Sequence, residues 1–263
     1  MSMLKTIWAY RGFIRGSIKR EFQSKYRNSL LGVAWTIINP TAMILVYTVI
    51  FSQVMQAKLP GIDSTFAYSI YLCAGVLTWG LFTDIVGRGQ NMFLDNANLL
   101  KKISFPRITL PIIVVLSASL NFAIVSILFL LFLLISGNFP GWVVLGALPI
   151  LVLQIFFSMG LGMALGVLNV FFRDVGQFFG LFLTFWFWLT PIVYPATILP
   201  ERVKPFMALN PMAPVISSYQ TIFVNQQWPS WTSLWPTAAT TVVLCLLGLN
   251  LFKKNAGEMV DEL

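Results

Sequence analysis

The sequence carries very little charge for its length. Only 10% of its 263 residues are charged, whereas a soluble domain usually has about 25%. Because the bilayer offers no water to a charged side chain, this depletion indicates a membrane protein. A hydrophobic content of 57% and a mean hydropathy of +0.80 support the same interpretation.

Several residues and motifs of soluble enzymes are also missing. Histidine is absent, which removes the commonest metal ligand and the commonest general base at neutral pH. Cys73 and Cys245 lie in apolar runs, and two cysteines are too few for a disulfide framework, so we predict packing roles. Without a GxxxxGK[ST] phosphate loop, the chain is not expected to hydrolyse ATP. We predict no catalytic, cofactor-binding or metal site in this chain.

The long uncharged runs predict an all-α integral membrane protein. A helix needs about 20 apolar residues to cross the hydrocarbon. The uncharged run 108–172 is too long for one span, and its GNFPG segment is a turn signal. We therefore predict one transmembrane domain, 1–263, with six spans at about 32–55, 64–87, 108–135, 142–170, 176–195 and 233–252.

The distribution of lysine and arginine predicts the orientation. Six spans put both termini on one side, and the side richer in cations is the cytoplasm. The segments on that side hold fourteen cations, and the other side holds three: Lys58, Arg202 and Lys204. We therefore predict cytoplasmic N and C termini. The net charge of +8 then reflects membrane orientation and requires no nucleic-acid partner.

Two segments are neither spans nor ordinary loops. At about 4–27, apolar residues recur at helical spacing among cations, which predicts an amphipathic helix in the cytoplasmic interface; a solvated basic tail is the alternative. The external segment, about 196–232, is rich in proline yet strongly apolar. We predict re-entrant short helices with a turn near Asn210, the alternative being a packed external cap.

Ionisable groups are scarce within the spans. Of the nine carboxylates, only Asp84 falls near a span interior, and Arg88 follows one helical turn later. We predict a structural ion pair between them, with a proton relay as the alternative. Gly162-x-x-x-Gly166 in the fourth predicted span indicates close helix packing. No energy source is evident, which favours a partner subunit that supplies it.

Four short stretches together resemble one family. Segment 95–107, DNANLLKKISFPR, is similar to the coupling-helix segment of type-2 ATP-binding-cassette (ABC) exporter permeases. YRNSLLGVAW at 26–35, LNVFFRDVG at 168–176 and LNPMAP at 209–214 resemble other parts of that family. The resemblance covers nearly the whole chain. It is closest to permeases that export O-antigen polysaccharide, capsule or teichoic acid.

The resemblance implies a multi-pass protein of the bacterial inner membrane, surrounded by membrane lipids. It implies a homodimer that binds two copies of a separate ATPase subunit, with ATP and Mg held by that subunit. It also implies that about 94–103 form a short cytoplasmic helix that docks on the ATPase; the alternative is a plain basic loop. The candidate coupling residues are Asn96, Asn98, Leu99, Leu100, Lys101 and Lys102.

The fifth predicted span is unusually aromatic. Sugar rings have apolar faces that stack on aromatic side chains, and the family places its first and fifth spans along the export channel. Lipid contact is the alternative, since tryptophan and phenylalanine commonly face lipid. The candidate channel-lining aromatics are Trp35, Tyr47, Phe178, Phe182, Phe185 and Trp186.

These observations favour a permease subunit that exports a lipid-linked polysaccharide, with O-antigen of lipopolysaccharide as the leading cargo. Capsule, teichoic acid, a lipid or a drug are alternative cargoes for the same kind of permease. A membrane glycosyl- or lipid-transferase is a more distant alternative. Such an enzyme needs acidic metal-binding or basic catalytic clusters at a membrane face, and we find none in the sequence.

Overall fold

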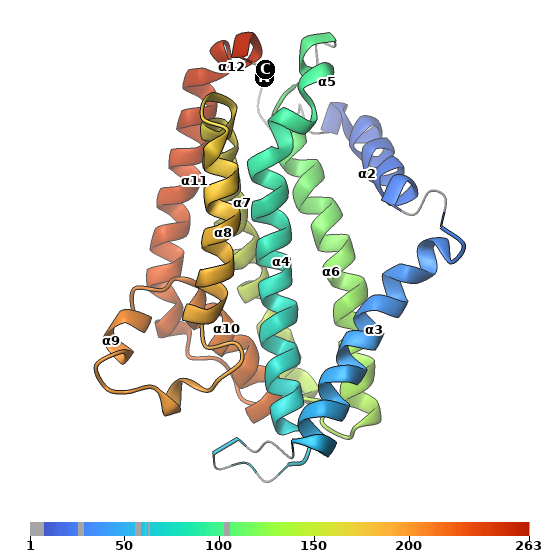
Figure 1. Cartoon of the computed structure of the whole chain (residues 1–263), viewed down its shortest axis with the longest axis vertical. Coiled ribbons are helices and arrows are strands. Elements are labelled where there is room, and N and C mark those ends of the chain that lie inside the picture. Colours follow the sequence, from blue (N-terminus) through green and yellow to red (C-terminus); the bar gives the residue numbers. More distant parts are fainter. Residues whose placement is uncertain are drawn as a thin grey trace.

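The computed structural model describes residues 8–25, 29–55, 59–60, 62, 64–102 and 106–262. This part of the chain is all-helical, apart from one isolated bridge between Leu59 and Ile62. The helices form an elongated bundle (Figure 1). Helices α2, α5 and α12 lie towards one end of it, and α9 lies towards the other.

Within the described residues, five helices are long and apolar enough to cross a membrane. They are α3 with its π-helical extension η2 (Trp35–Val54), α4 (Ala67–Asp95), α6 (Thr109–Ile135), η3 with α7 (Gly141–Phe171) and η6 with α11 (Trp231–Asn255). The predicted class, an all-α membrane protein, is thus confirmed. The predicted fifth span corresponds to α8 (Asp174–Leu189), whose 16 residues cover about 24 Å, less than the hydrocarbon thickness.

The other helices are short. They include α2 (Arg11–Lys25), the 3-10 turn η1 (Gly32–Ala34), α5 (Ala97–Lys102) and α12 (Glu258–Glu262). Between α8 and α11 lie η4 (Ala196–Ile198), α9 (Lys204–Met207), α10 (Met212–Gln220) and the π-helical turn η5 (Thr221–Asn225). The predicted interface segment 4–27 extends beyond α2 into residues outside the described part.

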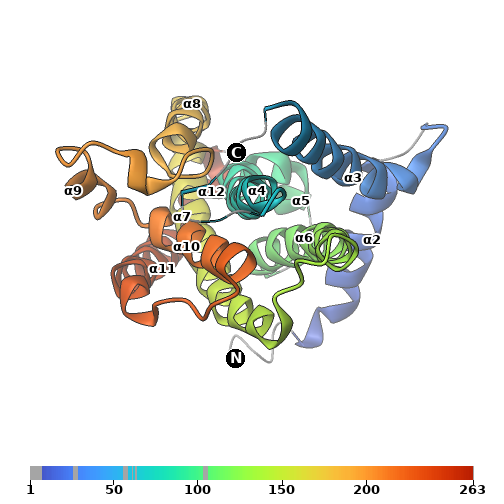
Figure 2. The ribbon, with the colours of Figure 1, turned by 90° about the horizontal axis from the view of Figure 1, so that it is seen from below.

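Helix α4 is the centre of the bundle (Figure 2). It packs against α6, α7, α8 and α10, and 67% of its most apolar window is buried, against 17% for α6. The exposed helix α6 is nevertheless the more apolar of the two. A soluble protein would bury its most apolar helix, so this inverse arrangement fits a bundle whose outer surface faces lipid.

Glycines bring three of the helices into close contact. A Cβ added at Gly89 of α4 would lie 2.9 Å from Gly162 Cα of α7, and one at Gly166 would lie 2.5 Å from the Gly89 carbonyl oxygen. On the opposite side of α7, a Cβ at Gly248 of α11 would lie 2.8 Å from the Gly160 carbonyl oxygen. The close packing predicted from Gly162-x-x-x-Gly166 is therefore confirmed, and it fixes α7 between α4 and α11.

Replacing Gly166 with alanine should destabilise the bundle, because its Cβ would meet a backbone oxygen that cannot rotate away. We expect a loss of about 2 kcal/mol, within the range for overpacked cores, measured as a lower Tm of the purified protein in detergent. The matched control is Gly80→Ala in α4, where nothing lies within 4 Å of the new Cβ. Equal Tm values for the two variants would contradict the proposed packing.

Candidate coupling helix and aromatic face

The predicted coupling segment forms α5, a separate short helix at the end of α4. Helix α4 continues to Asp95, so the predicted start near 94 falls inside α4, and the chain turns at Asn96. The Asn96 side chain donates to the Met92 carbonyl at 2.8 Å, while its own carbonyl accepts the Leu99 and Leu100 amides, each at 3.0 Å. Asn96 therefore closes α4 with its side chain and opens α5 with its backbone.

Leu100 attaches α5 to the bundle. Its side chain is buried in an apolar cluster that includes Phe93 of α4, Val167 of α7, Phe252 of α11 and Met259 of α12. Met259 is 1% exposed, and α12 packs against both α5 and α7. The C-terminal helix thus supports α5 from the side, an arrangement that the sequence pattern did not indicate.

Two of the remaining predicted coupling residues are on the exposed side of α5. Asn98 and Lys101 are exposed, and Leu99 is half-buried. The Lys102 side chain and residue 103 lie outside the described part. A six-residue helix with one buried leucine and an exposed polar side can contact another protein without unfolding from its own bundle.

The predicted Asp84–Arg88 pair is part of a larger polar cluster. The Arg88 guanidinium lies 3.9 Å from Asp84 but only 2.7 Å from Glu21 of α2. Ser117 of α6 donates to the same Glu21 oxygen at 2.8 Å. Arg88 therefore joins the predicted interface helix to α4 and α6. The sequence pattern gave Glu21 no role, although it is the only carboxylate in α2.

The aromatic residues of α8 divide between two environments. Phe178, Phe182 and Phe185 are exposed, and 61–70% of the surface of Phe178 and Phe185 is accessible. Trp186 instead turns inward, where its ring packs edge-on against Trp79 and Phe82 of α4. Of the four α8 candidates for channel lining, Trp186 is therefore half-buried, whereas the three phenylalanines are exposed.

The two aromatic candidates before α4 lie on α3. Trp35 is 37% exposed at the start of α3, and Tyr47 near its end is half-buried and 6.4 Å from the Phe51 ring centroid. Figure 2 shows α3 and α8 on the same side of α4. Both helices carry exposed apolar side chains, including Ile37 and Leu45 on α3 and Phe178 and Phe185 on α8.

Asn210 links the end of α8 to the predicted external segment. Its side-chain oxygen accepts the Trp186 indole N–H at 2.9 Å and the Met212 amide at 3.0 Å, while its amide group donates to Thr190 Oγ1 at 2.9 Å. Asn210 precedes α10, and its side chain therefore holds the start of α10 next to the last turn of α8. From there α10 runs back through the bundle and is buried against α4 and α7.

Comparison with known proteins identifies the family. The model of the ABC-2 type transporter family matches residues 14–224, most of the chain. The chain belongs to the ABC-2 type transporter family. Members of this family are transport subunits that pair with an ATPase subunit.

Individual relatives extend over nearly the full length. The chain is 33% identical over 263 residues to an O-antigen export system permease protein RfbA of Myxococcus xanthus, covering 99% of each chain. It is 28% identical to an RfbA of Klebsiella pneumoniae, covering 89% of this chain and 88% of the relative. It is 22% identical to the polysialic acid transport protein KpsM of Escherichia coli, covering 92% and 93%.

Replacing Asn210 with alanine should loosen the predicted external segment from α8, because three short side-chain hydrogen bonds and a longer one of 3.4 Å to the Leu189 carbonyl are lost together. We expect a loss of about 2–3 kcal/mol, at about 1 kcal/mol per bond. Hydrogen exchange of the backbone between α8 and α10 should accelerate more than exchange in α6. The control is Asn225→Ala, a change at an exposed position in η5. If both variants exchange at the wild-type rate, Asn210 does not hold this turn.

Proposed function

We propose that this chain is the membrane subunit of an ATP-driven exporter whose cargo is a lipid-linked polysaccharide, with O-antigen as the leading candidate. The observation that carries the proposal is the end-to-end similarity to relatives named O-antigen export permeases. The lower identity to a polysialic acid transport protein keeps a capsule-type polysaccharide as the second candidate cargo.

The proposed topology has six spans with both termini in the cytoplasm of a bacterium, in its inner membrane. Helix α8 is the short fifth span. Because Asn210 attaches α10 to its end, the re-entrant segment completes the crossing that α8 begins. Helix α2 lies in the cytoplasmic interface, held by the Glu21–Arg88 ion pair. Lipid headgroups would surround its exposed cations.

The proposed site of energy transfer is α5. Asn98 and Lys101 face outward, while Leu100 ties the helix to α4, α7, α11 and α12. Because α5 is packed against these helices, a movement that the ATPase imposes on α5 would be transmitted to the whole bundle. ATP and Mg would be bound by that separate subunit, and two copies would serve two copies of this chain.

The proposed cargo path runs along the side of α3 and α8. Phe178 and Phe185 leave large apolar surfaces exposed on a helix too short to span alone. A second copy of this chain, facing the first across this side, would enclose a conduit lined by aromatics from both. Stacking on sugar rings is weak and uncharged, so a polymer can slide along it. Trp35, Tyr47 and Phe182 are further candidates for this lining, while Trp186 anchors the external segment.

Replacing Lys101 with glutamate should weaken assembly with the cognate ATPase subunit, because the charge is reversed on the proposed docking side of α5. We expect at least a tenfold loss of ATPase co-purified from membranes, with the Tm of the isolated chain unchanged. The matched control is Arg202→Glu, an equal charge reversal at an exposed position next to α9. Normal assembly of the Lys101 variant would exclude this docking site.

Replacing Phe178 and Phe185 together with alanine should reduce polysaccharide export about tenfold, because two stacking surfaces are removed from the proposed conduit. Export is measured as surface polysaccharide in cells with equal amounts of assembled transporter. The control removes one exposed phenylalanine elsewhere on the bundle, Phe156→Ala in α7. Equal losses in the two variants would indicate a general effect of lipid-facing aromatics and would contradict the assigned path.

A further inference from the structure

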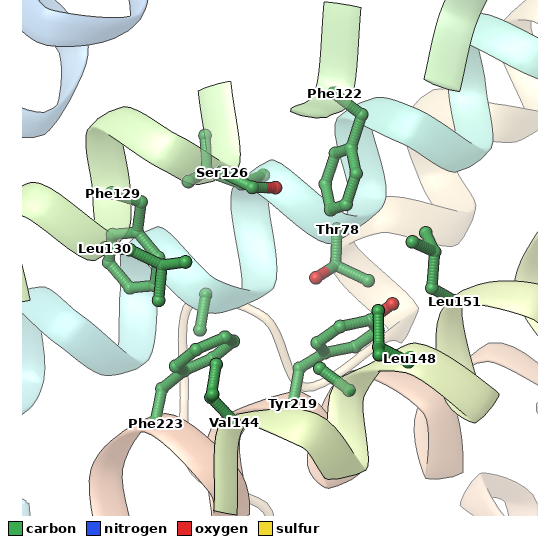
Figure 3. Close-up of a pocket in the computed structure, with 13 residues that line it drawn as sticks. Thr78, Phe122, Ser126, Phe129, Leu130, Val144, Leu148, Leu151, Tyr219 and Phe223 are labelled. Carbon is green, nitrogen blue, oxygen red and sulfur yellow. The ribbon is translucent and has the colours of Figure 1, made fainter. Parts of the chain in front are cut away.

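A cavity of about 150 Å³ lies within the bundle, away from the proposed cargo path. Its walls come from α4, α6, the η3–α7 span, α10 and η5 (Figure 3). Small side chains line these walls at Ala74, Thr78, Ser126 and Ala147. Helices α6 and α7 both pack along α4 but contact each other little, which leaves the space between them.

The cavity opens towards the outer surface of the bundle. Leu148, one of its lining residues, is 57% exposed, and Ser126 and Leu130 on the facing helix α6 are half-exposed. These residues belong to helices that we assign as membrane spans. The mouth between α6 and α7 therefore faces the hydrocarbon of the bilayer, and the material that can enter from there is a lipid chain.

One polar group in this apolar cavity lacks a partner. The Tyr219 hydroxyl is buried and makes no hydrogen bond within the described part of the protein. Figure 3 shows it directed into the space beside Leu148 and Thr78, while the ring packs parallel to Phe223. A buried hydroxyl without a partner costs about 1–3 kcal/mol, so an occupant that accepts its hydrogen bond would be favoured.

The depth of the cavity distinguishes between lipid classes. Leu148 lies seven residues beyond Gly141, about 13 Å along the span, because the first six residues form a 3-10 helix with a rise of about 2 Å per residue. Since the span is 31 residues long, it exceeds the roughly 30 Å hydrocarbon, and a span centred in the bilayer extends several Å past each edge. The cavity mouth is therefore close to the hydrocarbon edge, where the ester carbonyls of glycerophospholipids lie. A polyprenyl chain offers no acceptor at this depth.

From these observations we propose that the cavity binds one acyl chain of a glycerophospholipid, whose ester carbonyl accepts a hydrogen bond from Tyr219. The site uses α6 and α7 and none of the exposed aromatics of α3 and α8. It is a structural lipid site that fills the gap between α6 and α7. It rests on the membrane-spanning assignment and is independent of the identity of the exported cargo.

The test measures lipid retained by the full chain assembled with its ATPase subunit. The complex is delipidated in detergent, incubated with dioleoyl phosphatidylethanolamine or its diether analogue, and analysed by native mass spectrometry. Wild type should retain about fivefold more ester than ether lipid, the difference expected for one hydrogen bond. Tyr219→Phe should reduce ester retention to the ether level and leave ether retention unchanged.

A second variant tests the cavity itself. Ser126→Leu should fill the space and lower retention of both lipids about fivefold, whereas Ala123→Leu, at an exposed α6 position outside the cavity, should not.

Equal retention of ester and ether lipid by wild type would overturn the proposal, as would an ester preference that survives Tyr219→Phe. Displacement by polyprenyl phosphate as readily as by phospholipid would also overturn it, assigning the cavity to a prenyl chain. Because Tyr219→Phe preserves shape, the test stands even if Ser126→Leu fails to fold.

Discussion

The close contact between α4 and α7 is the constraint on which the rest of the bundle depends. Gly89 and Gly166 let the two backbones meet with no side chain between them. In a membrane, lipid tails are as apolar as the helices, so tight packing must supply much of the helix association. This contact makes α4 a buried central helix, with α5 attached to its end and the aromatic α8 packed on its side.

That arrangement connects the two proposed functional regions through one helix. Leu100 anchors α5 among residues of α4, α7, α11 and α12, while Trp79 of α4 packs against Trp186 of α8. A displacement at α5 would therefore reach the α8 side through packed side chains. Asn210 extends the same chain of contacts to the segment between α8 and α10. The lipid-facing helix α6 packs on another part of α4, where the Tyr219 cavity lies.

Much of this architecture is predictable from the sequence because the bilayer imposes strong rules. Runs without charge mark the spans, and glycine spacing marks the close contact at Gly162 and Gly166. Side-chain direction was harder to predict. Trp186 follows Phe182 by four residues and shares its helix face, yet its side chain packs into the bundle because it contacts Asn210 and Trp79. Helical spacing alone cannot show that, because the partners are far apart in the chain. The same holds for Glu21, whose partner Arg88 is in another helix.

The central claim is that the exposed aromatic side of α8 contacts the moving polysaccharide. The most direct measurement places a photo-reactive amino acid at position 185 in the complex with its ATPase and illuminates it during export. We predict a polysaccharide adduct at 185 that requires ATP, and no adduct when the same amino acid replaces Phe156. Continued export without any adduct at 185, or equal adducts at both positions, would contradict the account.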